Sequence, residues 1–335
     1  MGKILVTGAA GFIGFNICKC LIQNGFNVIG IDNLNSFVYS ARHKYNRLKT
    51  LGFQVDDLEK GNVISIDNME FHRLDLEDAA AIRALILDID FDLVIHASGL
   101  CNEGYSDKSP YVYIKNNTLS FVNVIDAIKE KSADIRPIFM FLSDLKALTC
   151  FDDKVETFNP KEHTYSIYTA SKAIEKSLAT TYAKGFGLKA IALDLATIYG
   201  EHDRVDGFVY KVATDVFKNE NSLEYDLQAD LVYIDDVTDF LLSLVKKLLD
   251  KDNIHADNYT EFKIASGKIV SRNELLQIVH KMILKLDDGE KPKTDIMSYV
   301  KVIDDLETCN CPISFRSKIS FVDGFCKALP WYLKR

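Results

Sequence analysis

A tyrosine and a lysine form a pair suited to acid–base chemistry. They stand four residues apart, in the segment Tyr168-Thr169-Ala170-Ser171-Lys172. On a helix, positions i and i+4 lie on the same face, so the phenol and the ammonium can point into one site. A nearby lysine cation favours the phenolate and so lowers the pKa of a tyrosine. The pair predicts that Tyr168 is a general base for a substrate hydroxyl. A Tyr-x-x-x-Lys spacing without other motifs is, however, common on helix surfaces.

A second pattern lies at the start of the chain, where the apolar run 3–7 breaks at Gly8-x-x-Gly11-x-x-Gly14 and resumes as an apolar helix over 12–22. A βαβ unit brings a dinucleotide pyrophosphate against backbone N–H groups and a helix N-terminus in this way. Glycines also simply permit tight turns, so the triad alone is weak evidence. Its position between strand and helix predicts a nucleotide cofactor at Gly8, Gly11, Phe12, Ile13 and Gly14.

An acidic residue, Asp32, closes the next apolar run and lies 18 residues beyond Gly14. This is close to the ~20-residue separation at which a carboxylate accepts hydrogen bonds from an adenosine ribose. The carboxylate favours NAD over NADP, because it would repel a 2′-phosphate. The nearby basic cluster Arg42, His43 and Lys44 is interpreted as a solvated helix face.

Composition excludes several classes of protein. The 335-residue chain is long enough for roughly two domains, and its net charge of −8 argues against nonspecific binding of nucleic acid. It has no apolar stretch near the ~20 residues that span a membrane and no signal-peptide pattern, so we expect a cytoplasmic protein. Seven cysteines, including Cys309 and Cys311, suggest free thiols. No metal site is predicted, and His96 and His202 are interpreted as a strand-end and a loop residue.

The order of the apolar runs indicates the fold. Strand-like runs at 91–97, 137–142 and 189–195 alternate with helical patterns at 111–129 and 168–185, as in a parallel sheet covered on both faces. We therefore predict an α/β protein with a Rossmann-like, doubly wound parallel sheet and a smaller C-terminal α/β substrate domain. The NAD-binding domain is expected at 1–195 plus 230–260, since 231–234 looks like a return to the sheet, and the substrate-binding domain at 196–229 plus 261–335. The active site is expected in the cleft between them.

With these residues the chain resembles, over nearly its whole length, the extended short-chain dehydrogenase/reductases of the NAD-dependent epimerase/dehydratase family, which act on nucleotide sugars. The likeness is greatest to UDP-glucuronate 4-epimerases. It implies that Asp75 and Leu76 flank the adenine, that Ala97, Ser98 and Gly99 lie beside the cofactor, and that Asn117 is the family's helix asparagine. The resemblance rests on these positions, on the glycine triad and on Tyr168 and Lys172. It rests further on Gly30–Asn35 with Asn33, Thr197–Gly200, Arg204–Asp206, Tyr233–Asp236 and Trp331-Tyr332.

The chain departs from the family at three places. A hydroxyl after the strand 137–142 normally completes a Ser/Thr-Tyr-Lys triad; an ungapped alignment puts Asp144 there, and a one-residue shift puts Ser143 there. A carboxylate so close would oppose phenolate formation, so chemistry favours Ser143. Two arginines of the family, of which the second commonly clamps the substrate's diphosphate, are replaced by Asp194 and Ala229. Arg204, Lys211 or Arg272 could substitute.

The resemblance implies an NAD-dependent nucleotide-sugar epimerase, most like a UDP-hexuronate or UDP-hexose 4-epimerase that works through a transient 4-keto intermediate. Tyr168 would accept the C4 hydroxyl proton, and Lys172 would hold the phenolate and the nicotinamide ribose. A 4,6-dehydratase is the alternative suggested by Ser143-Asp144-Leu145, although Leu145 cannot supply the base that elimination needs. A dehydrogenase/reductase of the family and a catalytically weak NAD-binding regulatory protein also stay open. The resemblance further implies a homodimer through the helices at 111–129 and 168–185.

Overall fold

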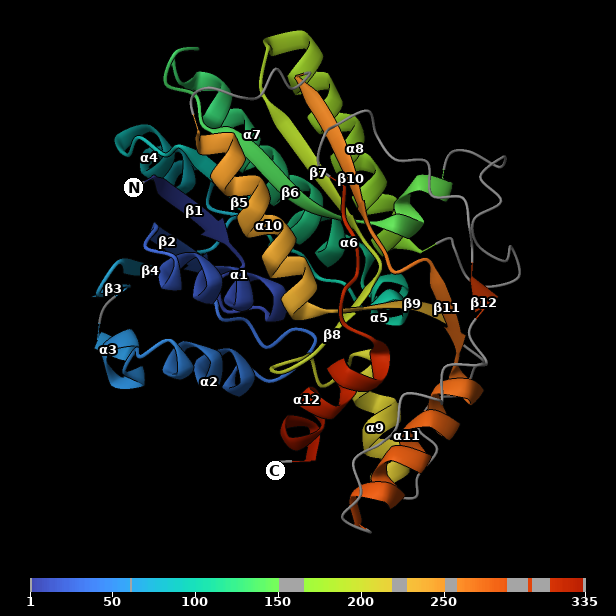
Figure 1. The fold of residues 1–335 in the computed structure, drawn as a ribbon. Helices are drawn as coiled ribbons and strands as arrows, with labels where there is room; N and C mark the ends of the chain where they lie inside the picture. Colours follow the sequence, from blue (N-terminus) through green and yellow to red (C-terminus); the bar gives the residue numbers. More distant parts are fainter. Residues whose placement is uncertain are drawn as a thin grey trace. The chain divides into compact units, whose positions relative to one another are not determined.

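The computed structural model describes residues 2–60, 62–150, 166–218, 228–250, 258–287, 301–302 and 314–333. Within them, an eight-stranded sheet has the order β10-β7-β6-β5-β1-β2-β4-β3 (Figure 1). β1 pairs in parallel with β2 and β5, β2 with β4, and β5 with β6, whereas β3 is an antiparallel edge strand. The predicted α/β fold with a large parallel sheet is confirmed. The strands are β1 Lys3–Thr7, β2 Asn27–Asp32, β3 Val63–Ile66, β4 Met69–Arg73, β5 Leu93–His96, β6 Ile138–Asp144, β7 Ala190–Leu195 and β10 Tyr259–Ile264.

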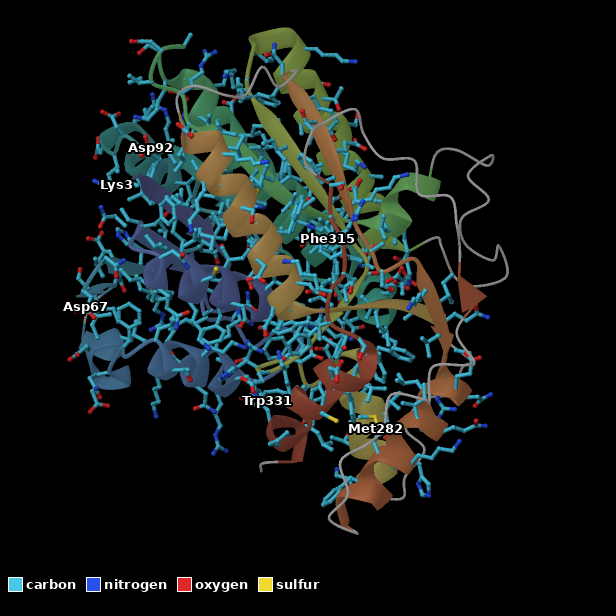
Figure 2. The ribbon with its side chains drawn as sticks, in the orientation of Figure 1. Lys3, Asp67, Asp92, Met282, Phe315 and Trp331 are labelled. Carbon is cyan, nitrogen blue, oxygen red and sulfur yellow. The ribbon has the colours of Figure 1, made fainter. Side chains whose placement is uncertain are left out.

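Helices cover this sheet on both faces. α4 (Ala79–Asp88), α7 (Ser120–Glu130) and α8 (Ile167–Phe186) share one apolar core with β1, β2, β5, β6 and β7, and α1 (Phe12–Gln23) packs on the opposite face (Figure 1). At the entry of β1, the backbone N–H of Lys3 donates to Asp92 Oδ2 at 2.7 Å (Figure 2). This contact joins the amino ends of β1 and β5, and because the central strands are parallel their carboxyl ends lie along the opposite edge of the sheet. Shorter helices are α2 (Arg42–Thr50), α3 (Val55–Lys60) and α5 (Glu103–Lys108).

The long helix predicted at 111–129 has three parts. α6 (Pro110–Tyr113) is followed by a π-helical segment at Ile114–Leu119 and then by α7. A π segment widens the helix locally, and such segments are frequent at functional sites. Asn117, a predicted cofactor residue, lies in it and is fully buried.

A second sheet, of four strands, has the order β12-β11-β9-β8. Its β9 (Gln228–Tyr233) pairs in parallel with β8 (Thr197–Tyr199), so the prediction that 231–234 returns to the large sheet is wrong. β9 is buried at every residue after its first, and a buried run alone does not tell which sheet a strand joins. The other elements of this region are β11 (Lys268–Ser271), β12 (Lys301–Val302), α9 (Phe208–Lys218), α11 (Arg272–Asp287) and α12 (Phe321–Leu333).

The chain divides into two compact units, 1–194 with 241–262, and 195–240 with 263–335. The division falls inside α10 (Ile234–Leu249), whereas the predicted domain boundary lies before β9. The assignment of NAD binding to one domain and substrate binding to the other stays a prediction. Among the described helices, none has the length and apolar character needed to cross a membrane.

Candidate functional site

The glycine triad forms a tight loop between β1 and α1. Gly11 donates its N–H to Gly8 O at 2.9 Å and is the N-cap of α1. A Cβ on Gly8 would come within 2.8 Å of Ala97 O and Ser98 Cα, and one on Gly14 would lie 2.1 Å from Gly8 O. Side chains are thus excluded from the loop, and the first N–H groups of α1 can face a pyrophosphate. Gly8 meets the predicted residues Ala97 and Ser98 here.

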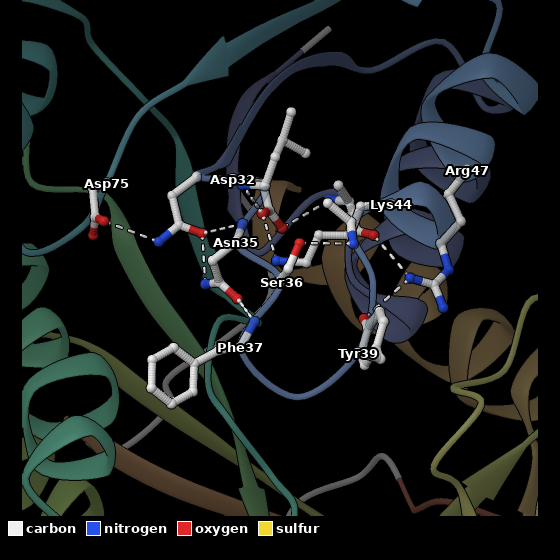
Figure 3. A network of polar contacts seen from close by, with 12 residues as sticks. Asp32, Asn35, Ser36, Phe37, Tyr39, Lys44, Arg47 and Asp75 are labelled. Atoms are coloured by element: carbon white, nitrogen blue, oxygen red, sulfur yellow. Dashed lines mark hydrogen bonds and ion pairs between the residues drawn. The ribbon is translucent and has the colours of Figure 1, made fainter. Parts of the chain in front are cut away.

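Asp32, at the end of β2, is the centre of a polar network (Figure 3). Its Oδ1 accepts hydrogen bonds from Lys44 Nζ at 3.0 Å and from the N–H of Leu34 at 2.8 Å, and its Oδ2 accepts from the N–H of Ala10 at 3.3 Å. Lys44 is buried, which corrects the interpretation of its cluster as a solvated face; only Arg42 of the three is exposed. Lys44 offsets the negative charge that was expected to repel a 2′-phosphate.

The predicted adenine residues lie beside this network. Asn33 donates from Nδ2 to Asp75 Oδ2 at 3.0 Å, and Asp75 Oδ1 accepts from the N–H of Glu77 at 3.0 Å. The Leu76 side chain is buried. The ends of β2 and β4 thus bring Asp32, Asn33 and Asp75 together, as the resemblance implies.

Asn117 fastens the segment after β5 to α8. Its Oδ1 accepts from the N–H of Leu100 at 2.8 Å, while its Nδ2 donates to Leu100 O at 2.9 Å and to Ser171 Oγ at 3.0 Å. Beside it, Gly99 has a φ of +152°, and a Cβ there would lie 3.2 Å from Lys172 Nζ. The cofactor segment 97–99 and the helix that carries Tyr168 and Lys172 therefore form one site.

Tyr168 is hydrogen-bonded to a carboxylate. Its hydroxyl donates to Asp144 Oδ2 at 2.9 Å, whereas Ser143 Oγ is buried and finds no hydrogen-bond partner among the described residues. Successive side chains of a strand point to opposite faces, and both residues belong to the end of β6, so only one of them can face the tyrosine. The preference for Ser143 as the partner of Tyr168 is wrong in this structure.

Lys172 is held by a second buried carboxylate. Its Nζ donates to Glu175 Oε2 at 3.0 Å and to Leu142 O at 3.2 Å. Glu175 is fully buried, and burial raises its pKa to about 7. Burial and the charge of Asp144 raise the pKa of Tyr168 well above its usual value, so the expectation that Lys172 lowers it is wrong.

The positions of the family's missing arginines have different surroundings. Asp194 Oδ2 lies 2.9 Å from Lys176 Nζ, which also lies 3.1 Å from Glu261 Oε2. Asp194 is fully buried, and burial raises its pKa to about 6. In the second unit, Ala229 is a buried residue of β9, and Arg204 is ion-paired with Asp206. That Arg204, Lys211 or Arg272 holds a diphosphate stays a prediction.

The histidines and cysteines form no site in the described part of the chain. His96 ends β5, as expected, and its Nδ1 lies 3.0 Å from Thr7 Oγ1; burial lowers its pKa to about 3. The ring of His202 lies 5.9 Å from that of Trp331. Across the described ranges, no group of three or more His, Cys, Asp or Glu side chains is arranged to hold a metal. Cys309 and Cys311 lie outside those ranges.

Three functional contacts were missed in the sequence. Glu175 follows Lys172 by three positions on one helix, and this spacing was a usable signal. Lys44 and Lys176 pair with acids on strands, and no local spacing marks these pairs. Both contacts depend on how the helices pack on the sheet.

These residues fit a bound dinucleotide. The side-chain-free loop at α1 can take the pyrophosphate, Asp32 and Asn33 stand where a ribose is expected, and Asp75 and Leu76 stand beside them. Tyr168, Lys172 and Asn117 complete the site next to segment 97–99.

Comparisons with known proteins agree with this geometry. The model of the NAD dependent epimerase/dehydratase family matches residues 4–256. A UDP-glucuronate 4-epimerase of Thermodesulfobacterium geofontis is 25% identical over 99% of this chain and 96% of its own, and the protein CapI of Staphylococcus aureus is 27% identical over 99% and 98%. Among solved structures, UDP-glucuronic acid 4-epimerase from Bacillus cereus, in complex with UDP-glucuronic acid and NAD, has a TM-score of 0.72 at 19% identity, with 98% of each chain covered. The UDP-glucose 4-epimerase of Thermotoga maritima has a TM-score of 0.71 at 22% identity, also over 98% of each chain.

Proposed function

The chain belongs to the NAD-dependent epimerase/dehydratase family, and on this premise we propose that it is a nucleotide-sugar 4-epimerase acting on a UDP-hexuronate or UDP-hexose. One observation carries the proposal: Tyr168 and Lys172, on one face of α8, are tied through Asn117 to the segment that packs on the glycine loop. An acid–base pair next to a dinucleotide cradle is what reversible oxidation of a sugar hydroxyl requires.

The residues of this chain divide the work of such a reaction. NAD would take a hydride from C4 of the sugar and return it. The glycine loop and the N-terminus of α1 hold the pyrophosphate, and Asp32 and Asp75 fix the adenosine end. Tyr168 exchanges the proton of the C4 hydroxyl, and Lys172 orients the tyrosine and the nicotinamide ribose. Arg204, Lys211 or Arg272 would hold the diphosphate in place of the absent arginines.

A 4,6-dehydratase is the second candidate, because Asp144 stands beside Tyr168 and could protonate a leaving hydroxyl. The neighbouring Leu145 is apolar, however, and cannot supply the base for the proton at the adjacent carbon. Besides the hydride transfer, epimerisation needs acid–base chemistry only at the C4 hydroxyl. We therefore rank it first.

The assembly and the location are part of the proposal. Exposed apolar side chains, Tyr111, Ile114, Leu119 and Phe186, lie on α6, the π segment and the end of α8. Exposed apolar side chains on consecutive helices can form an interface between two copies of a chain, and we propose a homodimer through these helices, in the cytoplasm.

Proton NMR in deuterated water tests the function. The protein is incubated with NAD and, in separate samples, with UDP-glucuronate, UDP-glucose, UDP-N-acetylglucosamine, GDP-mannose or dTDP-glucose. We expect a new C4 epimer without solvent deuterium, and we expect Tyr168→Phe to lose it while still binding NAD. A 4-keto-6-deoxy sugar carrying deuterium would instead establish the dehydratase. Unchanged spectra in every sample would refute both enzymes and leave a binding protein.

A further inference from the structure

The hydroxyl of Tyr168 is committed to Asp144. The 2.9 Å hydrogen bond to Asp144 Oδ2 leaves Oδ1 free to accept from the N–H of Lys146 at 2.8 Å, in the first turn of the 3-10 helix that follows β6. The backbone N–H of Lys146 therefore holds the Asp144 carboxylate in place, with Oδ2 facing the phenol of Tyr168. It is only partly buried, whereas Tyr168 is buried. This is the arrangement of a proton donor and its acceptor.

Lys172, the cation four residues after this tyrosine, is hydrogen-bonded to other groups. Lys172 Nζ lies between Glu175 Oε2 and Leu142 O, and Glu175 is fully buried. The other titratable groups that influence the phenol are Cys101 and Glu103, after β5, and Glu103 is itself ion-paired with Lys146 at 2.8 Å. A phenolate at Tyr168 would face the negative charge of Asp144, while Lys172 Nζ is already hydrogen-bonded to Glu175 and Leu142 O. The tyrosine needs another way to pass on a proton.

We propose that Asp144 is the proton acceptor behind Tyr168. When the C4 hydroxyl of the sugar is oxidised, its O–H bond breaks and its proton passes to Tyr168 Oη. The Tyr168 O–H bond breaks in the same step, and that proton passes to Asp144 Oδ2. Bound NAD would serve as the acceptor of the hydride that leaves C4 as the ketone forms, so charge and atoms balance. On reduction both proton transfers run in reverse. The inference rests on the proposed function and assigns Asp144 a role that acts through Tyr168.

The ionisation of Tyr168 tests the coupling without any cofactor or substrate. Protein labelled with ¹³C at the tyrosine Cζ is titrated with base, and Tyr168 is assigned from the signal lost in Tyr168→Phe. In Asp144→Asn the signal of Tyr168 should titrate at lower pH than in the wild type, because the facing negative charge is gone. An unchanged titration would overturn the proposal.

A second tyrosine–aspartate pair in the same unit supplies the matched control. Tyr182 donates to Asp126 Oδ1 at 2.9 Å, and burial and Asp126 raise the pKa of Tyr182 to about 12. Asp126→Asn should shift the titration of Tyr182 alone. Asp144→Glu, which keeps a carboxylate, guards against a variant that fails to fold, and circular dichroism monitors the fold of each variant.

Activity separates the failure of the relay from the failure of the function. We expect Asp144→Asn to lower kcat by about 100-fold or more with little change in KM. Asp144→Glu should recover part of kcat. A variant Asp144→Asn as fast as the wild type would overturn the relay and leave the epimerase standing. A wild-type protein that converts no nucleotide sugar would overturn both.

Discussion

Glu175 ties the stability of the site to pH. Burial raises the pKa of Glu175 from 4.5 to about 7, so the folded protein holds a proton on it that the unfolded chain has released. The contribution of Glu175 to stability must therefore fall as pH rises from 4.5 to about 7, since at this group the folded state then binds more protons than the unfolded state. In Glu175→Gln the fall over this range should be smaller. Urea denaturation at several pH values measures it.

An exposed glutamate provides the control for this prediction. Glu130 pairs with Arg83 at the surface, and the hydrogen bond from Arg83 lowers its pKa. Because its stabilising effect is lost only below 4.5, Glu130→Gln should leave the stability profile between 4.5 and about 7 unchanged. If Glu175→Gln also keeps the wild-type slope, Glu175 does not titrate as inferred.

Lys44 and Asp32 make a buried ion pair whose rupture should be costly. The two charged atoms lie 3.0 Å apart, and 11% and 5% of the respective side chains are exposed. Lys44→Ala leaves the Asp32 carboxylate buried without its cation, and we expect a loss of about 3 kcal/mol in the free energy of unfolding. Lys49→Ala, at an exposed lysine of the same helix, should cost under about 0.5 kcal/mol. Urea denaturation without cofactor compares them, and equal losses would contradict a special role for Lys44.

The members of the candidate site can be proposed from the sequence more readily than the contacts between them. Gly8, Asp32, Asn117 and Lys172 follow from spacing and resemblance, because each stands at a fixed place in a βαβ unit or on a helix face. The choice between Ser143 and Asp144 could not be made in this way. A shift of one residue along β6 exchanges the face on which each side chain lies, and only the packing of β6 against α8 decides it.

The turn from β1 into α1 has no room for a side chain. A Cβ on Gly14 would lie 2.1 Å from Gly8 O, so Gly14→Ala must displace the loop that is proposed to hold the pyrophosphate. We expect a loss of stability of about 1–3 kcal/mol and NADH binding about tenfold weaker, measured by urea denaturation and by fluorescence titration.

Gly185 in α8 is the matched helical glycine. Nothing lies within 4 Å of a Cβ built there, so Gly185→Ala should raise stability by up to about 1 kcal/mol through helix propensity and leave NADH binding unchanged. Equal effects of the two substitutions would mean that the close approach at Gly14 does not matter.

Helices and strands were predictable where their pattern is local. The periodic run at 168–185 is α8, with Ser166 and Thr169 forming its capping box and Gly187 ending it in a left-handed conformation. The π segment inside 111–129 could not be predicted, because the spacing of its apolar residues is that of an ordinary helix. The wider turn is visible only in the backbone hydrogen bonds around Asn117. The place of β9 was missed because the pairing of Thr197 with Leu231 is a long-range contact.

The division of the chain depends on the same kind of contact. The alternation of strand-like and helical runs changes near Gly200, close to where the second unit begins at 195. No local pattern marks the division inside α10. α10 is one continuous amphipathic helix, so its first turns and its last turns look alike in the sequence while they belong to different units.

Exposed apolar side chains on α6, the π segment and α8 make the homodimer testable. Tyr111 is 73% exposed there, the largest exposure among the large apolar side chains of the described residues. A charge buried in an interface without a partner destabilises it, so Tyr111→Asp should convert a dimer into monomers in sedimentation velocity experiments. Because dimerisation stabilises by mass action, the variant should also lose the dependence of Tm on protein concentration.

Phe217→Asp, at a 60% exposed residue of α9 in the second unit, should remain dimeric. A wild-type protein that sediments as a monomer, or a dimer that survives Tyr111→Asp but not Phe217→Asp, would place the interface elsewhere or remove it.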